Sequence, residues 1–305
     1  MELYIVDAFT KQRFSGNQAG VALLSHNEEF PTDIFMKSLA KELKHSETVF
    51  CKRLNDTTFN ARFFTPITEV DLCGHATIAL FTLLREKNKI SIGEYFLVTL
   101  AGTLSIAITE TAVWMDMAPP VSLRTFNEEE FMPFYEAYGL TRGDFPTDLV
   151  PQIISTGLRD IMLPVKDKET LQRAKQNRQQ VMELSKKYDV IGFHLFCPPK
   201  QVGEPVHCRN FAPLYDIDEE AATGTSNGAL TYYLHSYNYV AIGQEVIFLQ
   251  GETMGSPSEI LSKLSVCKGI LNIKIGGSAV VSLSVILEEF FHTINKKKLT
   301  DIKIS

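Results

Sequence analysis

Two segments of the chain combine residue types that could bind an acidic ligand and move a proton. Each runs from acidic residues through small and hydroxyl-bearing residues into an apolar stretch, and they span residues 69–77 and 218–226. The apolar stretches, residues 76–84 and 229–234, have almost no polar face, which predicts buried helices. The first turn of a helix leaves backbone N–H groups unpaired and carries partial positive charge. Two such helix starts facing one cleft would hold a substrate carboxylate.

Small residues at these helix starts would let a ligand approach the backbone closely. The candidate binding residues are Gly74 and Ala76 in the first segment, and Gly224, Thr225 and Ser226 in the second. The alternative is that the glycines and hydroxyls only cap the helices. For either segment alone capping would be the better interpretation, but two matched segments favour binding.

A repeated pattern supports a chain built from two similar halves. The sequence Arg-x-Phe-x-Pro occupies residues 62–66 and recurs 147 residues later at 209–213, before each of the two segments. The five residues alone could match by chance, but the matching context favours a true repeat. The chain has 305 residues, which suits two lobes better than one core.

The domain boundaries follow from the position of two prolines. Pro119 and Pro120 stop both helices and central strands, so they are the best candidate linker. We expect an N-terminal lobe over residues 1–118 and a C-terminal lobe over residues 119–284. The last residues, about 285–305, are expected to pack back on the first lobe.

Local patterns predict mostly strands with a few helices. Apolar spacing predicts a helix over residues 32–43, and alternation predicts a strand over residues 58–64. Residues 96–108 read as a hairpin that turns at residues 101–102. The polar stretch 167–187 predicts one or two surface helices.

Composition argues against several classes of partner. The formal charge of −6 gives no support to nucleic-acid binding, and no apolar run is long enough to cross a membrane. Five cysteines without paired spacing indicate reduced thiols and a cytoplasmic protein. The sequence contains no CxxC or HExxH motif, so we expect no metal site.

Several motifs resemble the phenazine-biosynthesis PhzF-like family, in the same order along the chain. They lie at residues 7–10, 14–19, 46–50, 62–77, 155–157, 211–213, 219–224 and 250–258. This family has the diaminopimelate-epimerase-like fold. The resemblance therefore implies an α+β protein of two pseudo-symmetric lobes, each a curved mixed β-sheet wrapped around a central buried α-helix. It also implies a homodimer.

The resemblance implies an isomerase or epimerase that moves a proton on a small acidic metabolite without a cofactor. Glu47 matches the family's acid/base carboxylate, His75 its site histidine, and Glu220 its second acidic position. A carboxyl in a dry pocket can accept and return a proton, and a histidine at a helix start tends to stay neutral. Asn17 and Gly157 match binding positions. Each assignment has a structural alternative. Glu47 would be a surface glutamate at the edge of a strand, and His75 a helix-capping or core histidine. Asn17 and Gly157 would be ordinary turn residues.

The chain departs from the family pattern at three positions. Glu220 replaces the usual aspartate, and Thr225 replaces the usual serine but keeps a hydroxyl. Ser256 stands where the family often has arginine, so a fixed cation for an acidic substrate is missing there. The substrate class is therefore open.

Two other functions remain as alternatives. The first is a binding or adaptor protein that kept the fold and lost turnover. The second is a cysteine-dependent racemase, which needs two opposed thiols. Cys73 fits one position, but Ala221 and Ala222 occupy the other, so one face of the substrate would lack a proton carrier. A hydrolase dyad of Cys73 and His75 lacks an orienting third group. Activity of Cys73→Ser would exclude the racemase.

Overall fold

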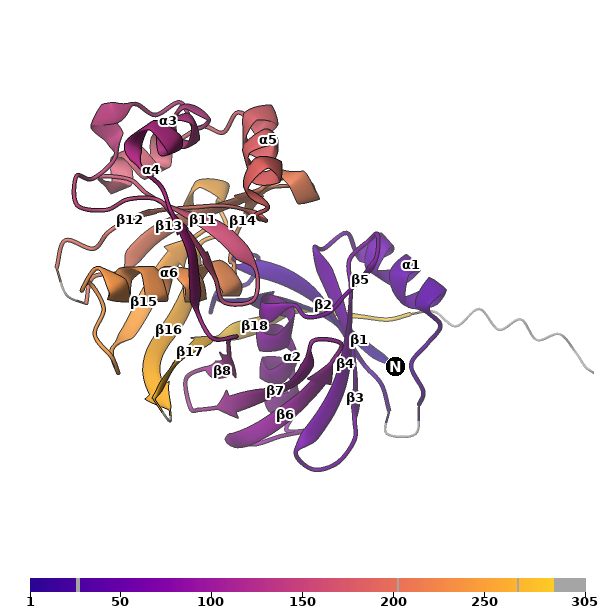
Figure 1. The fold of residues 1–305 in the computed structure, drawn as a ribbon. Helices are drawn as coiled ribbons and strands as arrows, with labels where there is room; N and C mark the ends of the chain where they lie inside the picture. The colour runs from indigo at the N-terminus through magenta and orange to yellow at the C-terminus, as the bar shows by residue number, and fades with distance from the viewer. Residues whose placement is uncertain (26–27, 202, 268, 288–305) are drawn as a thin grey trace, which may run out of the picture.

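Two lobes lie side by side, and each contains a sheet curved around one helix (Figure 1). The central helices are α2 (Gly74–Glu86) in the first lobe and α6 (Gly224–Ser236) in the second. The computed structural model describes residues 1–25, 28–201, 203–267 and 269–287. The predicted α+β fold with two similar lobes is confirmed.

The first lobe surrounds α2 with strands in mixed orientation. Its other elements are β1 (Glu2–Ala8), β2 (Asn17–Leu23), α1 (Asp33–Leu43), β3 (Glu47–Arg53), β4 (Thr58–Phe64), β5 (Glu69–Val70), β6 (Gly93–Thr99), β7 (Gly102–Ile108) and β8 (Val113–Asp116). Strands β2 and β3 are parallel, β3 and β4 antiparallel, and β4 and β6 parallel. The predicted helix over residues 32–43, strand over residues 58–64 and hairpin over residues 96–108 are confirmed.

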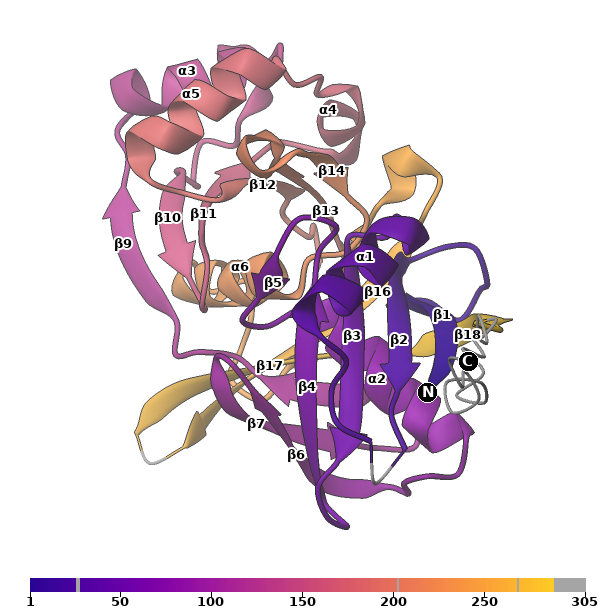
Figure 2. The same ribbon diagram turned by 90° about the vertical axis from the view of Figure 1, so that its right-hand side faces the viewer.

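The second lobe repeats this arrangement around α6. Its other elements are β9 (Val121–Thr125), α3 (Glu128–Glu136), β10 (Gln152–Ser155), β11 (Arg159–Pro164), α4 (Lys168–Arg173), α5 (Arg178–Tyr188), β12 (Gly192–Cys197), β13 (Val206–Ala212), β14 (Ile217–Glu220), β15 (Glu245–Gln250), β16 (Ser258–Cys267) and β17 (Ile270–Gly277). Strands β11 and β12 are parallel, β12 and β13 antiparallel, and β13 and β15 parallel. Strands β11, β12, β13 and β15 therefore pair in the same sequence of parallel, antiparallel and parallel contacts as β2, β3, β4 and β6. Helices α4 and α5 confirm the predicted surface helices and lie with α3 beyond the sheet (Figure 2).

The arginine of the repeated pattern has the same role in both lobes. Arg62 on β4 donates two hydrogen bonds to Glu69 on β5, at 2.7 and 2.6 Å. Arg209 on β13 donates two to Glu219 on β14, both at 2.8 Å. Each bidentate pair fixes the short strand that leads into a central helix.

Two strand pairings cross between the lobes. Strand β17 of the second lobe pairs with β8, and β18 (Ala279–Val285) pairs antiparallel with β1. The sequence analysis assigned residues 279–284 to the second lobe. This assignment is corrected, because these residues belong to β18 and join the sheet of the first lobe. Of the tail expected to pack back, residues 288–305 lie outside the described residues.

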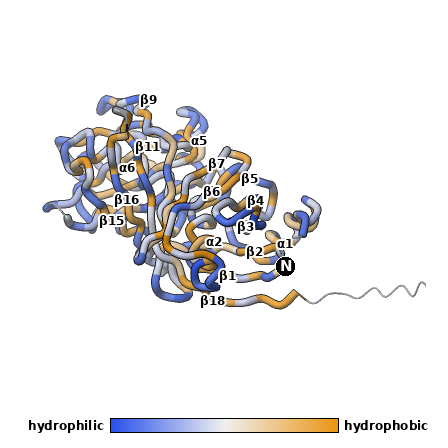
Figure 3. The backbone as a smooth tube through the Cα atoms, turned by 90° about the horizontal axis from the view of Figure 1, so that it is seen from below, coloured by the Kyte–Doolittle hydropathy of each residue, from blue (hydrophilic) through white to orange (hydrophobic). Residues whose placement is uncertain are grey.

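Apolar side chains all round the central helices explain why both are buried. Helix α2 buries Ile78, Leu80 and Phe81 completely, and α6 buries Leu230 and Tyr233. Hydrophobic and hydrophilic stretches alternate along the backbone in both lobes (Figure 3). No helix within the described residues is both long and apolar enough to cross a membrane.

Candidate active site

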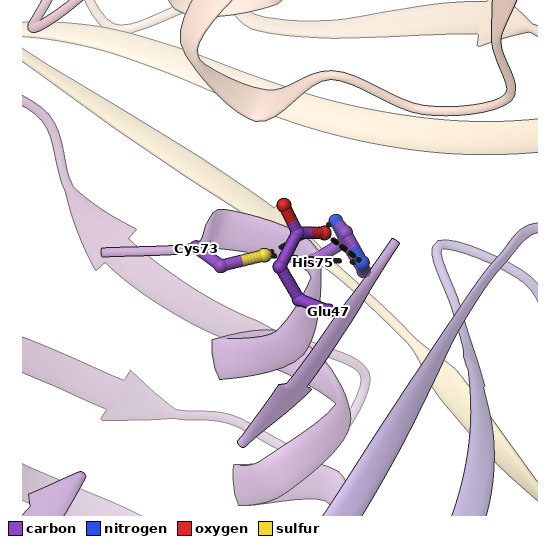
Figure 4. Close-up of side chains that lie close together, drawn as sticks. All are labelled: Glu47, Cys73 and His75. Atoms are coloured by element: carbon purple, nitrogen blue, oxygen red, sulfur yellow. Dashed lines mark hydrogen bonds and ion pairs between the residues drawn. The ribbon is translucent and has the colours of Figure 1, made fainter. Parts of the chain in front are cut away.

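Glu47, Cys73 and His75 lie together where β3 begins beside the first turn of α2 (Figure 4). The Nε2 atom of His75 is 3.4 Å from Oε2 of Glu47, and its Nδ1 atom is 3.3 Å from Sγ of Cys73. The hydroxyl oxygen of Ser46 is 3.2 Å from the same Nε2. The imidazole therefore lies between a carboxyl and a thiol, and two predicted catalytic residues are in contact.

Burial favours the neutral forms of both His75 and Cys73. Burial lowers the pKa of His75, which favours the neutral imidazole. Burial, followed by the charge of Glu47, raises the pKa of the Cys73 thiol well above its usual range. The Oε2 atom of Glu47 is buried without a hydrogen-bond partner among the described residues. The thiol is therefore a poor nucleophile, whereas the carboxyl has a free acceptor atom.

Glu220 brings a second carboxyl to this region from the other lobe. Its oxygens accept hydrogen bonds from Nδ2 of Asn17 at 3.1 Å and from the hydroxyl of Thr223 at 2.7 Å. Burial, followed by the charge of Glu47, raises the pKa of Glu220 to about 7. The charge of Glu220 also helps to raise the pKa of Cys73. The two lobes thus place their acidic side chains within electrostatic reach of each other.

Asn17 joins the two lobes at this point. It is buried at the start of β2, and its Nδ2 group also donates to the carbonyl oxygen of Ala222 at 2.9 Å. Both amide hydrogens are therefore directed to protein acceptors. In this structure Asn17 positions Glu220, and a direct contact between its amide and a substrate stays a prediction.

The starts of both central helices lack side-chain caps. Cys73 and Thr223 are the N-cap residues of α2 and α6, and neither side chain accepts a hydrogen bond from the helix. The hydroxyl of Thr223 donates to Glu220 instead. The backbone N–H groups near Gly74 and Gly224 are thus not capped by these side chains, as an anion site requires.

Gln250 at the end of β15 holds the segment that carries Glu220. Its buried Nε2 group donates to the carbonyl oxygen of Glu220 at 2.7 Å and to the hydroxyl of Thr223 at 3.0 Å. Its Oε1 atom accepts from the backbone N–H of Thr223 at 3.3 Å and from Asn227 at 2.9 Å. The sequence placed Gln250 in a family motif but indicated no role, because only the fold brings these groups together.

Comparison with known proteins identifies the family. The family model described as phenazine biosynthesis-like protein, PhzC-PhzF, matches residues 6–284. The chain belongs to the PhzC-PhzF family. This confirms the resemblance that the sequence motifs indicated.

Relatives of this PhzC-PhzF protein match along nearly their whole length. An uncharacterized isomerase of Clostridium acetobutylicum is 31% identical over 290 residues, which covers 92% of this chain and 95% of the relative. An uncharacterized isomerase of Deinococcus radiodurans is 33% identical over 288 residues, which covers 90% of this chain and 91% of the relative. The crystal structure of a Bacillus anthracis PhzF-family phenazine biosynthesis protein has a TM-score of 0.83 at 25% identity and covers 94% of this chain and 99% of its own. The names of the Clostridium and Deinococcus relatives agree with the predicted class of enzyme, an isomerase.

Three predicted binding residues of this PhzC-PhzF protein occupy different settings. The Ser226 hydroxyl donates to Asp160 at 2.5 Å and accepts from Asn210 at 3.0 Å, so it serves a buried polar network. Gly157 lies in an exposed turn with a φ of +134°. Half-buried Thr225 accepts a hydrogen bond from Thr156 through its carbonyl oxygen at 2.8 Å. Within the described residues, no hydrogen bond or ion pair links Ser226, Gly157 or Thr225 to Glu47 or Glu220.

Proposed function

We propose that this protein is an isomerase that moves a proton on a small carboxylate-bearing metabolite, without a cofactor and with Glu47 as the acid/base group. The observation that carries the proposal is the contact between Oε2 of Glu47 and Nε2 of His75, 3.4 Å apart, together with the Glu220 carboxyl of the other lobe, whose pKa the charge of Glu47 helps to raise. Glu47 has a buried, unpartnered oxygen, and the pKa of Glu220 is raised to about 7. Such a pair offers a proton acceptor and a proton donor near neutral pH.

In the proposed reaction, Oε2 of Glu47 removes a proton from a carbon that a neighbouring unsaturated or carboxyl group makes acidic. The electron pair of the broken C–H bond moves into that group, and a proton from Glu47 or Glu220 then forms a new C–H bond. No atom is gained or lost overall. The neutral imidazole of His75 orients the Glu47 carboxyl, 3.4 Å away. The starts of α2 and α6 bind the substrate carboxylate.

The decisive variant is Glu47→Gln, which keeps the shape of the side chain and removes its basic oxygen. We expect it to reduce solvent deuterium uptake into the substrate by about 100-fold or more, because general base catalysis contributes on that scale. Uptake is measured by mass spectrometry across a panel of small unsaturated carboxylic acids. Glu94→Gln, at an exposed position on β6, is the matched control and should leave uptake unchanged.

Two results would contradict this mechanism. Deuterium uptake that is undiminished in Glu47→Gln would remove Glu47 from the reaction. Tight binding of an acid by the wild-type protein, without exchange of any acid in the panel, would favour the non-catalytic binding protein. The predicted homodimer and cytoplasmic location stay predictions, and light scattering of the purified chain tests the first of them.

A further inference from the structure

Three classes of metal ligand meet beside the first turn of α2. The donor atoms of Glu47, Cys73 and His75 all lie within 4.8 Å of one another (Figure 4). Thiolate, imidazole and carboxylate are the ligand types that zinc takes in proteins, and three of them leave a fourth position open. The spacing of these residues in the sequence matches no zinc motif, so only the fold reveals the cluster.

The distances suit one tetrahedral ion. Zinc–ligand bonds of about 2.0–2.3 Å place neighbouring ligand atoms roughly 3.3–3.6 Å apart. Oε2 of Glu47 is 3.4 Å from Nε2 of His75, and Sγ of Cys73 is 3.8 Å from the same nitrogen. Sγ lies nearer Nδ1 of His75, at 3.3 Å, so an ion bound to Nε2 and Oε2 requires rotation of the imidazole or of the Cys73 side chain before the sulfur can join it.

The surrounding charges favour a cation. Glu47 and Glu220 are the acidic groups that shift the pKa of Cys73, and the same two carboxyls interact with each other. Among the described residues, no lysine or arginine forms an ion pair with Glu47 or Glu220. The basic group that acts on His75 is His45, and burial lowers the pKa of His45, which favours its neutral form. The buried Oε2 atom of Glu47 also lacks a donor among the described residues, and a bound ion would satisfy it.

We propose that Glu47, Cys73 and His75 bind a thiophilic divalent cation of the zinc class, and that this ion inhibits proton transfer. On binding, the thiol proton of Cys73 leaves to solvent, and the sulfur, Nε2 and carboxylate oxygen each donate a lone pair to the ion. The ion then occupies the oxygen that would accept the substrate proton. The inhibition rests on the proposed function, whereas the binding does not.

Cobalt(II) tests the binding, because a cysteine ligand gives it a thiolate-to-metal charge-transfer absorption in the near ultraviolet. The reduced full-length protein, freed of metal with a chelator, is titrated with CoCl2 and then with ZnCl2. We expect a band that zinc displaces, that Cys73→Ser removes, and that appears in Glu47→Gln only at about tenfold higher cobalt or more. Cys51→Ser, at a buried thiol on β3, is the matched control and should keep the band. No band in the wild type, or a band that survives in folded Cys73→Ser, would overturn the site.

Deuterium uptake tests the inhibition. We expect one equivalent of ZnCl2 to reduce uptake about tenfold or more in the wild type and in Cys51→Ser, and EDTA to restore it. The zinc concentration required should rise about tenfold or more in Cys73→Ser. Uptake unchanged by bound zinc overturns the inhibition alone. If the metal-free protein shows no deuterium uptake, both the proposed function and the inhibition are overturned. The cobalt band still decides whether the site binds metal.

Discussion

At the scale of single residues, the carboxyl of Glu220 links stability to pH. Burial and the charge of Glu47 raise the pKa of Glu220 to about 7 from its ordinary value of 4.5. The folded protein therefore binds more protons than the unfolded chain between these two values. The contribution of Glu220 to stability is fully present below pH 4.5 and is lost as the pH rises through 7.

Glu220→Gln should remove this dependence. Its single amide oxygen can accept from Asn17 or from Thr223 but not from both, because these two donors bind different oxygens of Glu220. At pH 8.5 the variant should be more stable than the wild type by roughly 3 kcal/mol at most, and below pH 4.5 the difference should vanish. Urea unfolding at pH 4, 6 and 8.5 measures the difference. A wild type that equals or exceeds the variant in stability at pH 8.5 would contradict the raised pKa.

At the scale of elements, the short link between β14 and α6 depends on Gln250. Gln250→Leu should leave the carbonyl of Glu220, the N–H of Thr223 and the amide of Asn227 without this partner inside the protein. We expect a loss of roughly 2–4 kcal/mol in the free energy of unfolding, since each buried unpaired group costs about 1–3 kcal/mol.

The same variant should also lower deuterium uptake, because the segment that carries Glu220 loses its anchor. The control is Gln179→Leu, which replaces an exposed glutamine on α5 and should change stability by less than about 0.5 kcal/mol. Urea midpoints and uptake rates are measured for both variants. If the two lose equal stability, the anchoring role of Gln250 is wrong.

The same elements show how far the sequence could predict the site. Apolar stretches with no polar face predicted both central helices correctly, because burial leaves a direct mark on composition. The orientation of Ser226 could not be predicted, since the pattern does not reveal which side of the first turn faces the other lobe. Its hydroxyl contacts Asp160, a residue 66 positions earlier. Contacts of that separation depend on the whole sheet.

At the scale of the whole molecule, the two lobes are similar, but strand pairing between β17 and β8 joins them. The repeat predicted the duplication, because the same arginine–glutamate pair has to fix the approach to each helix. The sequence predicted a return of the chain to the first lobe from about residue 285, but it could not predict that β18 already pairs with β1 from Ala279. A strand of Ala, Val, Leu and Ser residues suits either lobe, and its position depends on which sheet edge is available for pairing.

The two arginine–glutamate pairs differ in burial, and this predicts unequal contributions to stability. The side chain of Arg209 is 11% exposed and also donates to the carbonyls of Leu171 and Ala174, whereas that of Arg62 is 24% exposed. Arg209→Met should cost about 3–5 kcal/mol, because it removes the ion pair to the half-buried Glu219 and leaves the carbonyls of Leu171 and Ala174 without their donor. Arg62→Met should cost about 1–2 kcal/mol, since the partners of Arg62 are two carboxylates, Glu69 and the exposed Asp33, and no buried carbonyl depends on it among the described residues.

Urea unfolding of both variants tests this asymmetry, and a double variant identifies its cause. If the charge that loses its ion pair is responsible, Arg209→Met combined with Glu219→Met should recover part of the stability lost in Arg209→Met, because the half-buried carboxylate is gone. Equal losses in Arg62→Met and Arg209→Met would show that the duplicated pairs act identically. A double variant less stable than Arg209→Met would assign the loss to packing and to the carbonyls of Leu171 and Ala174.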